Sequence, residues 1–292
     1  MRSGSSPERR ERTPGDPQAK VSQRHPGRRP GRLSVVSLGP GGRSYIIPEA
    51  LGALLSAEVV LGYKTYLQLI SDLLEGKQVV SSGMRKELER CDHAIALAVE
   101  GKRVALVSSG DAGIYGMAGL VLDLCCRKGL TVARPKNGND AEEDLELEII
   151  PGVPAFNAAA SLVGAPLMHD FAAVSLSDHL TPWEWIEKRL MAAASADFVL
   201  ALYNPRSKTR PDLLETATNI LLKYRGPQTP VAIVRRAMRE GEQVLLTSLG
   251  SIPFEEVDMQ TMVIVGNSRT YVWRGWMITP RGYLDKYLSQ ES

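Results

Sequence analysis

The sequence predicts an α/β fold built from two α/β domains. Apolar runs of strand length alternate with segments of helical periodicity up to about residue 150, and strand-like runs cluster after residue 198. The Pro- and Gly-rich segment 151–154 separates the two patterns. We therefore expect a domain over residues 32–150, a second domain with more antiparallel pairing over residues 151–285, and tails at 1–31 and 286–292.

Local signals support each predicted element of the first half. Residues 33–38 form an apolar run that stops at a glycine-rich turn, and Pro48 suits the first turn of a helix. Leu88, Ile95 and Val99 share one face of a third helix. The expected strands are 33–38, 58–61, 79–80, 103–108, 130–133 and 145–150. The expected helices are 48–57, 64–74, 85–99 and a segment that follows Gly113 and runs to about Cys126.

The second half has equally clear signals. An alanine-rich run after Pro154 predicts a helix, residues 198–203 form a strongly apolar strand, and Pro211 is tolerated in a first helical turn. The expected helices are 155–163, 182–194 and 209–224. The expected strands are 172–176, 198–203, 230–234, 243–248, 261–265 and 271–273.

Charge is distributed unevenly along the 292 residues. Residues 1–32 hold nine Lys and Arg against three Asp and Glu, whereas the remaining residues hold 26 against 30. The first segment is also rich in Pro, Gly and Ser, which predicts a disordered basic tail. The mildly acidic remainder lacks the broad basic surface of a nucleic-acid-binding protein, so we expect no nucleic-acid partner.

The sequence gives no indication of a membrane or metal partner. No apolar stretch approaches the roughly 20 residues that cross a bilayer, and no secretory signal is present, so we expect a cytosolic protein. The three cysteines lack zinc-ligand spacing and the four histidines form no cluster. We expect no metal site and, without a cysteine-rich extension, no iron–sulfur cluster.

Two glycine-rich turns, at 39–42 and 110–113, directly follow predicted strands. In parallel α/β sheets the carboxyl ends of the strands border the ligand site, and glycine lets the backbone approach a ligand closely. The first turn is neither a G-x-G-x-x-G dinucleotide motif nor a P-loop. Each turn taken alone could equally be structural.

Polar side chains follow several of the predicted strands. Asp111 could accept hydrogen bonds from a ribose or attract a sulfonium cation, or it could cap the following helix. Asn204 could bind a ligand or form an Asx-turn before Pro205. Tyr63 and Lys64 could contact a ligand, or they could be exposed polar groups at the start of a helix.

Two further candidates carry weaker signals. Arg85 could pair with a ligand carboxylate, although a single arginine is more often a surface residue. His169 and Asp170 could form an acid–base pair, although adjacent side chains rarely face one another. Because the candidates come from many strand ends, they indicate a small-molecule site between two α/β layers without naming its reaction.

Together these motifs resemble the tetrapyrrole methylases, and within them the group that methylates precorrin-3B at C17. The similarity runs from Leu33 to Tyr283. The features shared with the whole family are the strand and loop at 35–41, the Gly-Asp pair at 110–111, the segment 151–153 and the strand 230–234. The more specific strings are LGYKTYL at 61–67, SGMR at 82–85, SSGDAGIYGMAG at 108–119, the segment 151–160, LYNPRS at 202–207 and TPRGY at 279–283.

The resemblance implies a homodimer whose two domains enclose a cleft for S-adenosylmethionine. It implies methylation of precorrin-3B, or of cobalt-factor III, at C17 with ring contraction to precorrin-4 in cobalamin biosynthesis. The positions that match the family's cofactor contacts are Pro40, Ser109, Gly110, Asp111, Ile114, Tyr115, Pro154, Ala155, Asn204 and Ala237. Ring contraction needs proton movement, and the candidates for this role are Lys64, Tyr63, Arg85 and His169.

Two positions depart from the wider family. Many relatives have Gly-Asp-Pro where this chain has Ala112, and many have Ser or Thr at Pro154, so a hydroxyl contact is lost there. The alternatives are a sibling corrin methyltransferase acting at another carbon, an RNA methylase of the same fold that uses the basic tail, and a non-enzymatic nucleotide-binding module.

Overall fold

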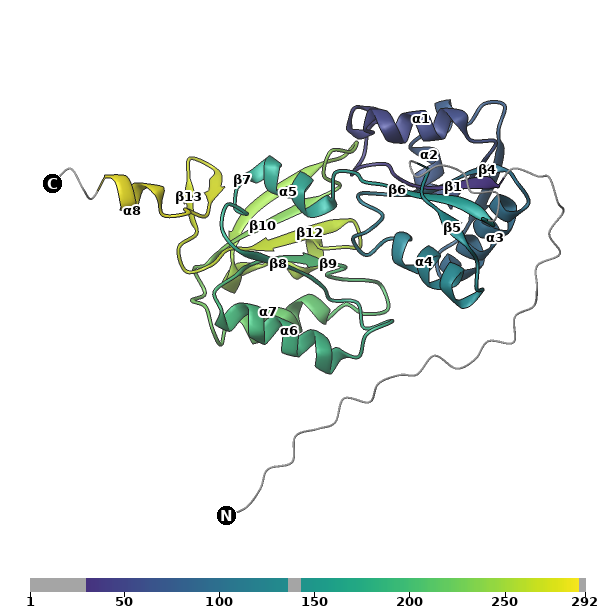
Figure 1. Ribbon diagram of the computed structural model, residues 1–292. Helices are drawn as coiled ribbons and strands as arrows, with labels where there is room; N and C mark the ends of the chain where they lie inside the picture. The colour runs from purple at the N-terminus through teal and green to yellow at the C-terminus, as the bar shows by residue number, and fades with distance from the viewer. Residues whose placement is uncertain (1–29, 136–142, 289–292) are drawn as a thin grey trace, which may run out of the picture.

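Two sheets form most of the described part of the computed structural model, residues 30–135 and 143–288 (Figure 1). Within these residues the first sheet has six strands: β1 (Gly31–Ser37), β2 (Val59–Tyr63), β3 (Gln78–Ser82), β4 (Arg103–Ser108), β5 (Val132–Ala133) and β6 (Leu145–Ile150). Their order is β3-β2-β4-β1-β6-β5, and neighbouring strands are parallel. The α/β prediction is confirmed. Most of the predicted basic tail lies outside the described residues.

Helices cover both faces of this sheet: α1 (Pro48–Ser56) and α2 (Lys64–Gln68) on one, and α3 (Glu87–Val99) and α4 (Ala118–Arg127) on the other (Figure 1). Leu33 and Val35 of β1 pack in the core with α3 and α4, whereas Val36 packs in the core with α1 and α2. A strand buried on both faces needs apolar side chains pointing both ways. This explains why β1 appears in the sequence as a nearly continuous apolar run.

The strand order creates a point where the chain connections diverge. From β1 the chain crosses to β2 on one side, and from the neighbouring β4 it crosses to β5 on the other side. The loops that leave β1 and β4 therefore separate at the sheet edge, and ligands of open α/β sheets bind at such a point. The fold thus places residues 38–42 and 109–117 beside a potential ligand site.

The second sheet has the predicted antiparallel character. Within the described residues its strands are β8 (Phe171–Ser175), β9 (Val199–Tyr203), β10 (Pro230–Arg235), β11 (Gln243–Ser248) and β12 (Thr261–Val265), in the order β11-β10-β12-β9-β8. Only β8 and β9 pair in parallel. One face is covered by α6 (Trp183–Ser195) and α7 (Leu213–Leu221), and the other by α5 (Ala155–Val163).

A C-terminal arm follows the second sheet. It consists of β13 (Tyr271–Trp273), β14 (Trp276–Ile278), which pairs with β7 (Gly164–Ala165), and α8 (Tyr283–Tyr287). Figure 1 shows α8 standing away from both sheets. The expected boundary between domain and tail at residue 285 falls inside α8. Within the described residues, no helix combines the length and apolar character needed to cross a membrane.

Most helix boundaries differ from the predicted ones. The predicted helix 64–74 ends at Gln68 and is followed by a 3-10 turn over Ser71–Leu73. The predicted helix 209–224 begins only at Leu213, because Ser207 and Arg210 form an antiparallel bridge that turns the chain. The remaining 3-10 turns are Arg43–Tyr45, Leu249–Ser251 and Phe254–Glu256.

Candidate functional site

Loops from five parallel strands lie along one edge of the first sheet. In strand order the connections follow β3, β2, β4, β1 and β6, and their residues include Arg85, Lys64, Ser109, Pro40 and Pro154 respectively, with Lys64 at the first position of α2. Parallel strands bring their carboxyl ends to a common edge, so segments far apart in sequence become neighbours. The structure therefore brings together most of the predicted site residues of the first half.

The loops after β1, β4 and β6 meet through their backbones. Gly39 N donates to the Gly110 carbonyl at 3.1 Å, and Gly110 N donates to the Gly39 carbonyl at 2.7 Å. Both glycines have positive φ, at 70° and 66°. A Cβ on Gly152 would lie 2.6 Å from the Gly110 carbonyl oxygen. This close approach requires glycine and explains the predicted glycine-rich turns.

Asp111 joins two of these loops. One carboxylate oxygen accepts a hydrogen bond from Gly113 N at 2.7 Å, and the other accepts from Gly152 N at 3.0 Å. The alternative role of Asp111 as a helix cap is wrong, because α4 begins at Ala118 and its N-cap position is Met117. The helix starts later than predicted because residues 113–117 first form a turn.

Tyrosine side chains connect this turn to the second sheet. The rings of Tyr115 and Tyr203 lie 5.0 Å apart, and Tyr115 Oη donates to the Ala173 carbonyl at 3.0 Å. Phe156 N donates to Tyr203 Oη at 3.4 Å. Burial raises the pKa of Tyr203 to about 12, with a smaller effect in the same direction from Asp111. Its phenol is therefore neutral at physiological pH.

The second sheet also places Asn204 and Ala237 at this side. Asn204 follows β9, and its side-chain amide donates to Ser175 Oγ at the end of β8 at 2.9 Å. Ala237 is half-buried in the hairpin that joins β10 and β11. The strands β8, β9 and β10 run in the same direction, so their carboxyl ends share one edge. Among the remaining predicted cofactor contacts, Ile114 lies in the turn after Asp111 and Ala155 opens α5.

The hairpin after β10 contributes a residue that the sequence did not indicate. Arg239 reaches the first sheet, where its Nη2 donates to Ser109 Oγ at 2.5 Å and its Nε donates to the Pro40 carbonyl. In the same hairpin, Met238 Sδ accepts a hydrogen bond from Tyr45 Oη at 2.8 Å. No local pattern separates Arg239 from other arginines, so only tertiary structure reveals it.

Backbone strain gathers in these loops. Among the described residues, seven non-glycine positions have positive φ, and five of them lie in the loops of this site: Arg85, Tyr115, Asn204, Arg236 and Met238. Such conformations cost free energy and persist only where the surrounding structure enforces them, often at functional sites.

The proposed acid–base residues are not all at this edge. Tyr63 packs edge-to-face against Tyr66 at 5.3 Å, Lys64 is exposed beside it, and Arg85 is exposed in the next loop. His169 precedes β8, at the strand end opposite Ser175, so the structure does not bring it to the other candidates.

Arg90 supports the loop of Arg85, a role that the sequence did not reveal. Arg90 is only 5% exposed, and it donates to Ser82 Oγ at 2.5 Å and to the Gly83 carbonyl at 2.9 Å. These bonds fix the backbone just before Arg85.

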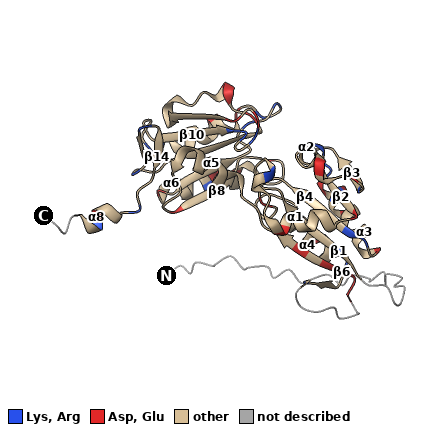
Figure 2. Ribbon diagram, turned by 90° about the horizontal axis from the view of Figure 1, so that it is seen from above, with Lys and Arg blue, Asp and Glu red and all other residues tan. Residues whose placement is uncertain are grey.

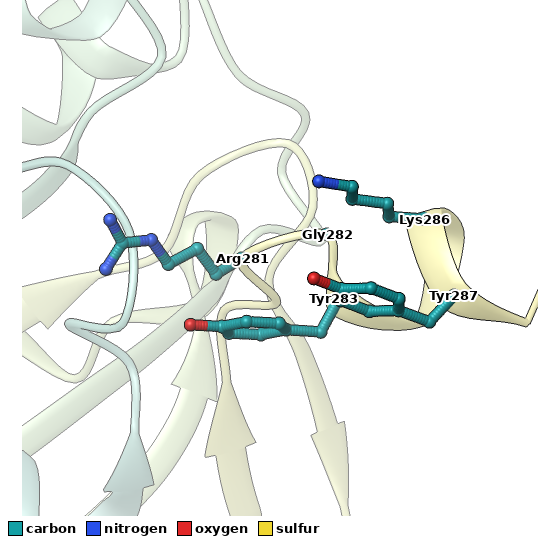
Figure 3. A pocket seen from close by; sticks show the side chains of 5 residues that line it. All are labelled: Arg281, Gly282, Tyr283, Lys286 and Tyr287. Atoms are coloured by element: carbon teal, nitrogen blue, oxygen red, sulfur yellow. The ribbon is translucent and has the colours of Figure 1, made fainter.

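Two hollows lie near predicted residues. One is bordered by Ser177, Asn204, Ser207, Arg210, Leu213 and Met259. The other lies at the start of α8, where Figure 3 shows its lining residues Arg281, Gly282, Tyr283, Lys286 and Tyr287. The second hollow is formed by the C-terminal arm alone, so it does not belong to the loops described above.

The groups at the strand ends suit an adenosyl amino acid better than a metal ion. They supply the Asp111 carboxylate, the Asn204 amide, a cation at Arg239 and aromatic rings at Tyr115 and Tyr203. Within residues 30–135 and 143–288, no three His, Cys, Asp or Glu side chains gather as a metal site would need. The arrangement can hold ribose hydroxyls, amino and carboxylate groups.

Comparisons with known proteins point to one family. The family description Tetrapyrrole (Corrin/Porphyrin) Methylases matches residues 32–253. A probable cobalt-factor III C(17)-methyltransferase of Salmonella typhimurium is 53% identical over 86% of this chain and 99% of that protein. A cobalt-factor III methyltransferase of Priestia megaterium is 49% identical over 88% of this chain, which spans only 46% of that relative. The crystal structure of the methyltransferase CobJ is similar with a TM-score of 0.78 and 37% identity, covering 86% of this chain and 100% of that one.

Proposed function

Because the chain belongs to the tetrapyrrole (corrin/porphyrin) methylase family, we propose that it methylates a corrin precursor at C17 and contracts the ring in cobalamin biosynthesis. The methyl donor is S-adenosylmethionine. The observation that carries this proposal is the meeting of the loops after β1, β4 and β6 at the point where the chain connections diverge. These are the loops in which the sequence resemblance places the cofactor.

We take cobalt-factor III as the substrate, ahead of metal-free precorrin-3B. The relatives at 53% and 49% identity are both named for cobalt-factor III. A sibling corrin methyltransferase would need a different set of specific strings. The RNA methylase alternative lacks support because Lys and Arg are interspersed with Asp and Glu over both sheets (Figure 2).

The site residues have separable tasks in this reaction. S-adenosylmethionine supplies a methyl group activated by its sulfonium. Asp111, Asn204 and the backbone of residues 109–113 would hold and orient this cofactor, aided by Pro40, Pro154 and Ala155. Alignment in a site shielded from water is the main catalytic requirement for a direct displacement.

Ring contraction requires a group that moves a proton at a substrate oxygen. Tyr63 ends β2, Lys64 opens α2 directly after it, and Arg85 follows β3, on the side of the sheet next to the β4 loop assigned to the cofactor. We assign the proton transfer to this part of the edge. His169 has the least support, because it lies at the opposite strand end.

We also propose that the protein acts in the cytosol as a homodimer. The C-terminal arm exposes large apolar side chains, including Trp273 at 56%, Leu284 at 68% and Leu288 at 58%. Large exposed apolar patches mark interaction surfaces. The double substitution Leu284→Asp and Leu288→Asp should shift the protein from dimer to monomer in light scattering. A wild-type monomer would contradict the proposal.

Incubation of the full chain with labelled S-adenosylmethionine tests the function. Parallel reactions contain cobalt-factor III or precorrin-3B. We expect label in a ring-contracted product, mainly from cobalt-factor III. Cofactor binding without label in either product would contradict the C17 assignment, and stronger labelling from precorrin-3B would reverse the choice of substrate.

A further inference from the structure

Arg239 is a cation placed between the two sheets. It lies in the hairpin between β10 and β11, yet its guanidinium contacts Ser109 and Pro40, in the loops after β4 and β1. The contact is closely fitted, because a Cβ on Gly41 would lie 2.4 Å from Cγ of Arg239. The backbone at neighbouring Met238 has a positive φ of 59°. The chain therefore accepts strain to hold this guanidinium at the candidate cofactor loops.

No carboxylate compensates this charge. Among residues 30–135 and 143–288, Arg239 forms no ion pair, and the two groups that accept hydrogen bonds from its guanidinium, the Pro40 backbone carbonyl and the Ser109 hydroxyl, are neutral. By contrast, Arg235 on the same hairpin pairs with Asp258 at 2.8 Å. Of the two acids nearest in sequence, Glu240 is exposed and forms no ion pair within the described residues, and Glu242 accepts a hydrogen bond from Met238 N at 2.7 Å.

This environment makes an anion favourable. Arg239 is half-buried, and its burial lowers its pKa, although a guanidinium stays charged at physiological pH. Two nearby groups also affect the pKa of Arg239: Tyr66 raises it and Arg236 lowers it. The Tyr66 phenol is neutral at physiological pH and Arg236 is itself a cation, so neither is a counter-ion. A partly desolvated cation without a counter-ion gains strongly from a carboxylate, and a guanidinium has five N–H donors with which to bind one.

We propose that Arg239 binds a carboxylate of a ligand at this site. The inference rests on the proposed function, in which two ligands carry that group. One source is the methionyl carboxylate of the cofactor, and the other is a carboxylate side chain of the tetrapyrrole. The contacts of Arg239 with Pro40 and Ser109 place the guanidinium where both ligands would meet.

The test compares Arg239→Met and Arg239→Lys with wild type and with Arg127→Met. Arg127 is exposed at the last position of α4, so it lies at the opposite edge of the parallel sheet and controls for the loss of one charge. Calorimetry measures binding of S-adenosylhomocysteine and of its decarboxylated analogue, which keeps the amino group. Methyl transfer to cobalt-factor III gives the KM for the tetrapyrrole. Thermal melts confirm folding.

Two outcomes support the inference and identify the source. If Arg239 binds the cofactor, Arg239→Met weakens the binding of S-adenosylhomocysteine by at least about tenfold and leaves the affinity for the decarboxylated analogue unchanged. If it binds the substrate, both cofactor affinities stay constant and the KM rises by at least about tenfold. In either case Arg239→Lys, which keeps the charge but not the planar fork, gives a smaller change.

Two other outcomes overturn the inference. An equal loss of affinity for S-adenosylhomocysteine and for its decarboxylated analogue would mean that Arg239 only holds the loops together. Unchanged affinities and KM would mean that it binds neither carboxylate. Both results leave the proposed function intact, because wild-type binding and methyl transfer are measured first. A wild-type protein that binds no S-adenosylhomocysteine would instead reject the proposed function, and this inference with it.

Discussion

The two sheets contribute to the site in different ways. The parallel sheet contributes mainly backbone groups, because Gly39, Gly110 and Gly152 let the three loops after β1, β4 and β6 approach one another closely. The second sheet offers side chains, with Tyr203 at the end of β9, Asn204 directly after it and Arg239 in a hairpin. The parallel sheet therefore builds its part of the site from adjacent strand ends, whereas the second sheet combines strand-end residues with a hairpin that carries Arg239 to the first sheet.

The largest effect should come from filling the backbone contact. Gly152→Ala places a Cβ 2.6 Å from both the Gly110 carbonyl oxygen and Ser37 Cβ, so the three loops must separate. We expect the unfolding free energy, measured by urea unfolding, to fall by roughly 1–3 kcal/mol. We also expect weaker binding of S-adenosylhomocysteine, measured by calorimetry.

Gly119→Ala is the matched control, because Gly119 lies in α4 and nothing lies within 4 Å of its added Cβ. This variant should bind S-adenosylhomocysteine as wild type does, and its unfolding free energy should rise by up to about 1 kcal/mol because alanine has the higher helix propensity. Equal behaviour of the two variants would show that the loops do not need close contact.

A smaller effect should follow from Asp111→Asn. The carboxylate accepts from Gly113 N and Gly152 N through different oxygens, and an asparagine amide can accept through only one. One backbone N–H then loses its acceptor, and because neither N–H is fully buried this costs about 1 kcal/mol of unfolding free energy. We expect cofactor affinity to fall as well, in calorimetric titration. Undiminished stability would show that Asp111 does not join the loops.

The smallest effect concerns Tyr203 in the second sheet. Its folded pKa of about 12 lies above the ordinary value of 10.0, so the neutral phenol stabilises the folded state below pH 10. As pH rises from about 10 to 12 the unfolded state ionises first, and this stability is lost. Tyr203→Phe should therefore lose less unfolding free energy than wild type between pH 9 and 11. Parallel pH profiles would refute the assignment.

Most strands, and the loops that follow them, are predictable from the sequence. The predicted strands 103–108 and 145–150 match β4 and β6. β4 has an apolar interior because it is buried on both faces, and β6 has apolar residues at alternate positions and at its end. The glycine-rich turns marked the loops, because glycine allows positive φ and close backbone approach. Helix boundaries were less accurate, as at residue 213, where a turn stabilised by a bridge between Ser207 and Arg210 displaces the helix start.

Several features depended on long-range contacts and were missed. The short strands β7 and β14 exist only because Gly164 and Met277 pair across more than a hundred residues. The separation of His169 from the other candidates follows from the register of β8 against β9. Neither fact leaves a pattern in the neighbouring sequence.

The α/β fold class, the positions of most strands and the loops that carry glycine, Asp111 and Asn204 follow from the sequence alone, because these depend on local periodicity and backbone freedom. Three features emerge only in the folded chain: β4 lies between β2 and β1, Asp111 joins two loops, and Arg239 crosses from one sheet to the other. Strand order and contacts between distant side chains arise from packing between segments far apart in the chain. The local sequence around these residues carries no periodic pattern that would predict such contacts.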